Sequence, residues 1–149
     1  MEALYIASRK AFASTYGFML LAACYHWNVK GPHFSEYHDL FGKIYNEVNL
    51  KIDIFAEQLR GIQTYTPASF SELQELSDIS LEPYSGVDHT TDEMLHNLYI
   101  ANGKINADLL EAFTIAVQEH EHGLSNFISE RMEQHRKHGW MLYASLKVI

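Results

Sequence analysis

The sequence predicts an all-α chain: a bundle of four long helices joined by one long crossover that holds a short helix of its own. Apolar residues recur at helical spacing over long stretches, and no run alternates convincingly as a strand would. The three prolines, Pro32, Pro67 and Pro83, lie in polar or glycine-containing stretches, so they mark connections. With 149 residues, one domain over residues 1–149 is the default.

The first two helices are expected on either side of a tight reversal near Pro32. The first covers residues 3–29, and residues 18–27 are apolar almost all the way round. Such a helix needs cover on more than one side, from the bundle, from an oligomer interface, or from both. The second helix has Ser35 as its expected N-cap and Gly61 as the residue that follows its end. Its apolar face alternates steps of three and four along Phe41, Tyr45, Val48, Ile52, Phe55 and Leu59.

The crossover, residues 62–89, is long for an ordinary loop. Ser71 and Gln74 have the spacing of a capping pair, so a short helix is expected over residues 72–77. The crossover therefore spans the bundle with some structure of its own.

The last two helices follow the crossover. Thr90 and Glu93 have capping-box spacing, which predicts the start of the third helix, and its apolar face continues toward Glu119. Gly123 is the expected break before the fourth helix. Four long helices with one long crossover make the ferritin-like variant of the four-helix bundle.

The chain is acidic, with 19 Asp and Glu against 11 Lys and Arg, a formal net charge of −8, nine His and one Cys. A lone Cys24 forms no disulfide within the chain, and residues 1–10 lack the pattern of a secretory signal, so we expect a cytoplasmic protein. No membrane partner is expected, because the longest apolar run, residues 17–25, is less than half of the roughly 20 residues that a membrane-spanning helix needs. The basic residues are scattered, which disfavours phosphate binding, and the acids and histidines together suggest cations.

Four residues raise the question of a metal site. His26 lies near the end of the first helix and His38 about one turn into the second, so the reversal places the two imidazoles at nearly the same height. Asp53 and Glu57 are an i, i+4 pair whose carboxylates project from one helix face. They belong to a polar stripe along the second helix: Gly42, Asn46, Asn49, Asp53 and Glu57. Taken singly, each histidine is more typical of a core or surface residue, and the acidic pair of a solvated face.

Distance decides how these four residues meet. His38 and Asp53 are roughly 22 Å apart along one helix at about 1.5 Å per residue, so they do not share an ion within one chain. A two-fold axis through the middle of the second helix would bring His38 of one copy to Asp53 and Glu57 of another, giving two equivalent sites per dimer. Two histidines and two carboxylates with open positions suit Fe(II) better than a closed structural zinc site.

The chain resembles the Dps family, the mini-ferritins named as DNA-binding proteins from starved cells. The resemblance is strongest over residues 25–61 and extends, more weakly, over nearly the whole chain. It rests on the run His26-Trp27-Asn28-Val29-Lys30-Gly31-Pro32, on Phe34, His38, Phe41, Asp53, Ala56 and Glu57, and on a late Trp140-Met141-Leu142.

The resemblance implies a hollow dodecamer built from two-fold dimers. It implies oxidation of Fe(II), by hydrogen peroxide or oxygen, and storage of Fe(III) inside, which protects DNA from oxidative damage. His26 and His38 would come from one subunit and Asp53 and Glu57 from its partner, with zinc as a substitute metal. Trp27 would lie beside the site as an aromatic able to give up an electron, and it is equally compatible with a packed interface.

Two departures from the family pattern stand out. Many members carry an acidic residue four positions after the second histidine, where this chain has Gly42, so the second iron position is expected to be weak. The family's Asp-x-x-Thr near the start of the last helix is replaced by Glu121 and Leu124. An acidic iron channel is therefore only partly supported. Its candidate residues are Glu119, Glu121, Glu130, His120 and His122. Glu119 and His122 also have the Glu-x-x-His spacing of larger di-iron proteins, but the second such motif is absent.

Three alternatives remain open. A Dps-like shell that has weak or lost ferroxidase activity is favoured by Gly42. A nucleoid protein that compacts DNA is disfavoured by the charge and by the absence of a lysine-rich tail, so direct DNA binding is expected to be weak or absent. A monomeric helical interaction protein would have no shared site at all.

Overall fold

The computed structural model describes residues 1–84 and 86–146, so Ser85 and the last three residues of the predicted 1–149 domain lie outside the described residues. The predicted fold class is confirmed: four long helices and one short helix make up the fold, and the described residues contain no strand. The helices are α1 (Glu2–Asn28), α2 (Phe34–Gly61), α3 (Phe70–Leu76), α4 (Thr91–Gln118) and α5 (His122–Ser145). Within the described part of the chain, none of them has a stretch apolar and long enough to span a membrane.

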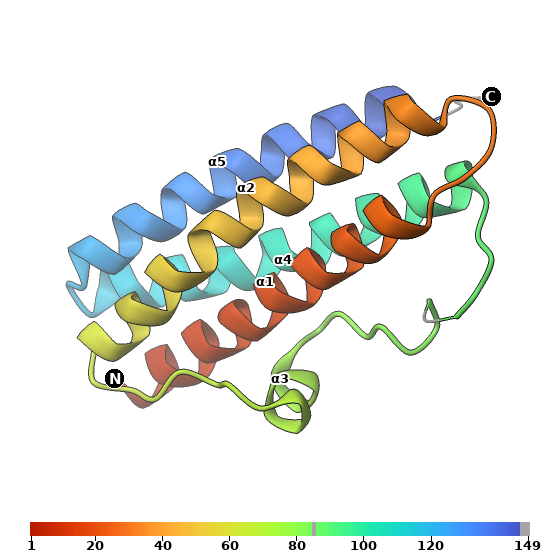
Figure 1. The fold of residues 1–149 in the computed structure, drawn as a ribbon. Coiled ribbons are helices and arrows are strands. Elements are labelled where there is room, and N and C mark those ends of the chain that lie inside the picture. The colour runs from red at the N-terminus through yellow and green to blue at the C-terminus, as the bar shows by residue number, and fades with distance from the viewer. Residues whose placement is uncertain (85, 147–149) are drawn as a thin grey trace.

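The four long helices lie side by side, and the crossover with α3 runs back along α1 (Figure 1). Helix α1 packs against α2 and α4, and α5 packs against α4 and α2. The α1–α2 turn lies at the same end of the bundle as the end of α5, and the N-terminus lies at the opposite end (Figure 1). There the Met1 ammonium donates to Glu119 Oε1 at 3.2 Å, at the end of α4. This topology places α1 and α2, which carry the candidate ligands, as one antiparallel pair.

The core is built from the stripes that the sequence predicts. Phe41, Val48 and Phe55 of α2 are fully buried. The Phe55 ring meets Phe12 of α1 at 5.5 Å and Phe127 of α5 at 5.2 Å, both at steep angles, which are favourable aromatic contacts. Helix α1 is buried on most of its circumference between Phe18 and Tyr25, as its all-round apolar character requires.

The predicted helix starts are partly wrong. The capping box of Thr90 and Glu93 is confirmed. Ser35 is not the N-cap of α2, because the helix begins one residue earlier, at Phe34, after a left-handed residue in the turn. Ser71 is not the cap of α3 either: Ser69 accepts from the Glu72 amide, so the short helix starts at residue 70. At α3 two serines compete for one cap, whereas the N-cap residue of α2, His33, makes no side-chain capping bond.

The predicted helix ends also differ in detail. Gly61 is the last residue of α2 rather than the one after it. Gly123 does not separate the two helices: it lies in the first turn of α5, and residues 119–121 make the reversal. His120 takes the left-handed conformation there, with φ of 62°. Glycine destabilises a helix mainly when it lies in the helix interior, so a glycine is readily accepted in the first turn.

Candidate metal centre

The structure brings His26 and His38 together beside the turn that joins α1 to α2. Their rings stack with centroids 4.0 Å apart and planes 16° from parallel. Both side chains are half-buried. The predicted proximity of the two imidazoles is confirmed, whereas their role as metal ligands stays a prediction.

The hydrogen bonds of this pair fix the tautomer of each neutral ring. His26 Nδ1 lies 2.7 Å from the main-chain oxygen of His38, and His38 Nδ1 lies 2.6 Å from the main-chain oxygen of His26. A carbonyl oxygen only accepts, so both Nδ1 atoms carry the proton and donate. In the neutral rings the lone pair is then on Nε2. This is the arrangement in which a histidine binds a metal through Nε2 while its other nitrogen is held by a second-shell carbonyl.

Aromatic rings flank the histidine pair on both sides. Phe34 stacks on His38 at 5.0 Å, and Tyr45 stacks on His26 at 6.1 Å. Trp27 meets Tyr45 edge-on at 6.1 Å. The Trp27 side chain is 61% exposed, so it is not part of the core of this chain. A large exposed aromatic beside a polar pair is typical of a surface that a partner covers.

The two candidate carboxylates do not join the histidines within one chain. Asp53 and Glu57 are both exposed on α2, and Asp53 is roughly 22 Å along the helix from His38. No group of three or more His, Cys, Asp or Glu able to hold an ion occurs within the described chain. Leu50 and Ile54 are also exposed on this stretch of α2, at 73% and 43%. Large apolar side chains exposed beside this acidic pair are typical of a surface that a partner covers.

Gly42 departs from the predicted polar stripe. It is buried, because the His26 ring lies directly over it. The stripe that remains open on α2 starts at Asn46 and reaches Glu57.

The predicted channel residues gather near the α4–α5 turn, with two of the three carboxylates already paired. Glu119 accepts from the Met1 ammonium, and Glu130 pairs with Lys51 at 3.1 Å. The His120 and His122 rings lie 6.0 Å apart, and Glu121 is the N-cap residue of α5 with no side-chain capping bond. The Glu119-x-x-His122 pair lies in this turn at the bundle end, away from the interior. These positions leave the channel a prediction.

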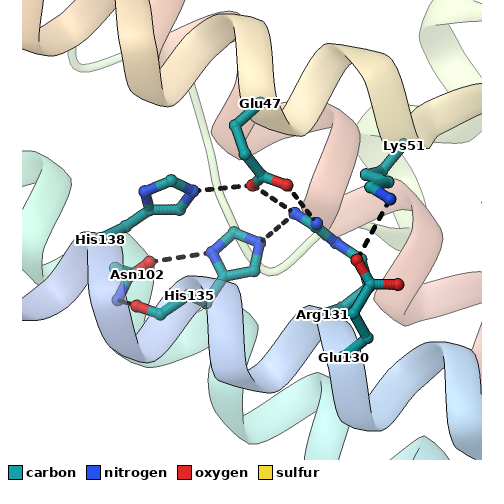
Figure 2. A network of polar contacts seen from close by, with 7 residues as sticks. All are labelled: Glu47, Lys51, Asn102, Glu130, Arg131, His135 and His138. Atoms are coloured by element: carbon teal, nitrogen blue, oxygen red, sulfur yellow. Dashed lines mark hydrogen bonds and ion pairs between the residues drawn. The ribbon is translucent and has the colours of Figure 1, made fainter.

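A second polar cluster, which we call the interior network, lies inside the bundle between α2, α4 and α5 (Figure 2). Arg131 donates through both terminal nitrogens to the Glu47 carboxylate, and His138 Nε2 donates to Glu47 Oε1 at 2.8 Å. Burial raises the pKa of Glu47, but the hydrogen bonds from Arg131 and His138 outweigh it and hold the pKa well below its usual range. Arg131 is 1% exposed, so its charge is matched almost entirely by Glu47.

The other half of the interior network joins α5 to α4. Asn102 Oδ1 lies 2.9 Å from His135 Nδ1, and Asn102 Nδ2 donates to the His135 carbonyl at 2.7 Å. His135 Nδ1 therefore carries a proton, which leaves Nε2 as the acceptor facing Arg131 at 3.5 Å. Burial, then the charges of Arg131 and His138, lower the pKa of His135 well below its usual value, so the ring is neutral.

Neither His135 nor His138 had a predicted role, although a signal was present. Arg131, His135 and His138 continue, at steps of three and four, the α5 face that begins at Leu124 and Ile128 and ends at Leu142. Three polar residues in register with an apolar stripe must be buried, and buried polar groups need partners. Their partners lie on other helices, which spacing along one helix does not identify.

Comparison with known proteins agrees with this architecture. Residues 10–149 match the Ferritin family, a ferritin-like domain. The chain is 29% identical over 122 residues to DNA protection during starvation protein 2 of Bacillus anthracis, which covers 82% of each chain. The Dps protein of Vibrio cholerae, described as a member of a broad superfamily of ferritin-like diiron-carboxylate proteins, is 26% identical with a TM-score of 0.86 over 98% of this chain and 90% of that one. Dps of Thermosynechococcus elongatus, 23% identical, has the same fold with a TM-score of 0.91 over 99% of this chain and 92% of that one.

Proposed function

Because the chain belongs to the ferritin-like family, and within it to the Dps family, we propose that it oxidises Fe(II) at sites shared across two-fold dimers. The product Fe(III) is stored inside a shell of such dimers, which protects DNA indirectly by removing Fe(II) and peroxide. His26 and His38 of one subunit and Asp53 and Glu57 of its partner hold the Fe(II) substrate. Zinc is the expected competitor for the same donors.

The observation that carries this proposal is the fixed tautomer of each histidine in the pair. Each Nδ1 is committed to a main-chain carbonyl, so each Nε2 presents a lone pair without prior rearrangement. Two half-buried imidazoles locked in this way have no evident role in packing the core. The carboxylates that would complete a site lie on the same helix but out of reach, which supports a second copy as their source.

Fe(II) and Trp27 together supply the two electrons that reduce one hydrogen peroxide. Reduction of hydrogen peroxide to two waters takes two electrons and two protons, and one Fe(II) supplies one electron. Trp27, which lies next to His26 in the sequence and contacts Tyr45, supplies the second electron, and a later Fe(II) reduces the oxidised tryptophan. The balance is two Fe(II) oxidised per peroxide reduced, with no hydroxyl radical released.

Inter-subunit complementation tests the shared site. One variant carries His26→Ala and His38→Ala, and the other carries Asp53→Ala and Glu57→Ala. Each alone should oxidise Fe(II) no faster than buffer in stopped-flow absorbance after mixing with peroxide. Shells assembled from an equal mixture should recover about a quarter of the wild-type rate, because half of the dimers are mixed and each mixed dimer has one intact site of two.

His96→Ala serves as the matched control, since His96 is exposed on α4 and outside the candidate site. It should retain the full rate. Mixed shells as inactive as their parents would show that the four residues do not form one site across subunits, and two fully active parents would show that they are not ligands.

A shell that binds iron without oxidising it is the second candidate, and Gly42 is the observation that favours it. With glycine there, the position one helical turn after His38 offers no side-chain ligand. Fe(II) binding measured without oxidant, together with a wild-type oxidation rate equal to buffer, would select this second function.

A further inference from the structure

Gly42 lies in direct contact with the ring of His26. A Cβ added at Gly42 would come within 2.7 Å of His26 Cε1 and 2.8 Å of His26 Nδ1. Side-chain carbon atoms do not approach so closely, so any residue other than glycine at position 42 must displace this ring. The imidazole of His26 therefore packs directly against the backbone of α2 at Gly42.

The His26 ring has little room to move in response. His38 stacks on it at 4.0 Å and Tyr45 at 6.1 Å. Its Nδ1 donates to the His38 carbonyl at 2.7 Å, and this hydrogen bond fixes the direction of its Nε2 lone pair. A displacement that cleared a Cβ at position 42 would break this bond or the stack.

A side chain at position 42 would also lie beside His38. Residue 42 is four positions after His38, so its side chain would lie one turn along the same helix face, where a carboxylate could complete a second set of ligands. In this chain the His26 ring occupies that space. One side chain at most fits there, either the ring of His26 in its bonded position or a substituent on residue 42.

We propose that Gly42 is a positioning residue that holds His26 in its bonded position and thereby limits each shared site to a single divalent transition-metal ion. The proposal rests on the proposed function for the identity of the site. It implies that an acidic side chain at position 42 does not add a second ion. Such a side chain instead weakens binding of the first ion, because it removes the second-shell bond of His26.

Calorimetric titration of the assembled, metal-free protein with Co²⁺ tests the count. The wild type should bind one Co²⁺ per site. Gly42→Ala should bind at least about tenfold more weakly, the usual effect of losing a second-shell partner. Gly42→Asp should be weaker still and should not reach two ions. Gly103→Ala is the control, since a Cβ at that helical glycine meets nothing within 4 Å. Two ions per site in Gly42→Asp, or unchanged affinity in Gly42→Ala, would overturn the proposal.

A thermal cycle in the presence of chelator tests the positioning without any metal. Alanine normally stabilises a helix relative to glycine, so Gly103→Ala should raise the melting temperature. Gly42→Ala should lower it, and should raise it when His26→Ala has already removed the ring. If Gly42→Ala raises the melting temperature in both backgrounds, the contact does not position His26. This result is independent of iron oxidation, so a failure of the proposed function and a failure of this inference are distinguishable.

Discussion

Replacing Glu47 by glutamine should destabilise the protein severely. Glu47→Gln keeps the size of the side chain but removes the only carboxylate that faces Arg131 in the interior network. Arg131 is 1% exposed, so the guanidinium then stays buried with its positive charge unmatched. Removing one partner of a buried pair in this way costs about 3–5 kcal/mol. For a domain of this size each kcal/mol lowers the melting temperature by about 2–4 °C, so the expected loss is about 6–20 °C.

The matched control is Glu130→Gln. Glu130 of α5 also pairs with a basic residue of α2, Lys51. This pair is at the surface, where such interactions contribute about 0–1 kcal/mol. Urea unfolding and thermal melting of the wild type and both variants give the comparison. A double variant, Glu47→Gln with Arg131→Met, should recover much of the lost stability, because no buried charge is left unmatched. Equal stability of Glu47→Gln and Glu130→Gln would refute the reasoning.

The same argument gives a sign for the pH dependence. The pKa of Glu47 is depressed in the folded state, so its contribution to the free energy of unfolding is complete above the unfolded pKa of about 4.3. That contribution is lost as the pH falls through the folded pKa. The stability gap between the wild type and Glu47→Gln should therefore narrow as the pH falls below about 4.

Three further predictions concern other parts of the molecule. Burial and a hydrogen bond with Asp78 raise the pKa of Asp108 to about 6, so this group should lower the free energy of unfolding of the wild type as the pH rises from 4 to 6. Asp108→Asn should abolish that decline, and a variant melting profile parallel to the wild type between pH 4 and 8 would contradict it. Trp27→Phe should leave Fe(II) binding unchanged but slow oxidation several-fold and remove the aromatic radical signal in freeze-quenched EPR spectra; an undiminished signal would rule out Trp27 as its source. Because the net charge is −8, DNA should show no mobility shift at physiological pH and salt, and a tight, salt-sensitive complex would overturn this.

The fold was readable from the sequence because its signal is repeated. Every turn of α2 places another apolar residue on the same face, and Phe41, Val48 and Phe55 are all fully buried as that pattern predicts. Helix ends depend on one or two residues each, so a single misleading signal is enough to shift them. The α4–α5 reversal shows this well, since the glycine that looked like the break at Gly123 lies in α5, while His120 takes the left-handed conformation.

Only those parts of the candidate site that depend on neighbouring segments of the chain could be predicted from the sequence. The proximity of His26 and His38 follows from two helices and the short turn between them, and it is confirmed. The burial of Gly42 under the His26 ring was missed, because helix periodicity alone places position 42 on the open polar stripe. The pairing of Glu47 with Arg131 joins residues 84 positions apart, and no spacing rule connects them.

The interior network also explains why metal chemistry in this chain is expected at the surface. Glu47 is fully engaged by Arg131 and His138, and His135 Nδ1 is engaged by Asn102. An ion entering the bundle would have to displace the buried guanidinium from its carboxylate, at the cost of leaving that charge unmatched. Ligands on the outer faces of α1 and α2 carry no such penalty, but a convex helical surface cannot surround an ion with four donors. A second copy is then the simplest source of the missing half, which makes assembly a condition of the proposed activity rather than an addition to it.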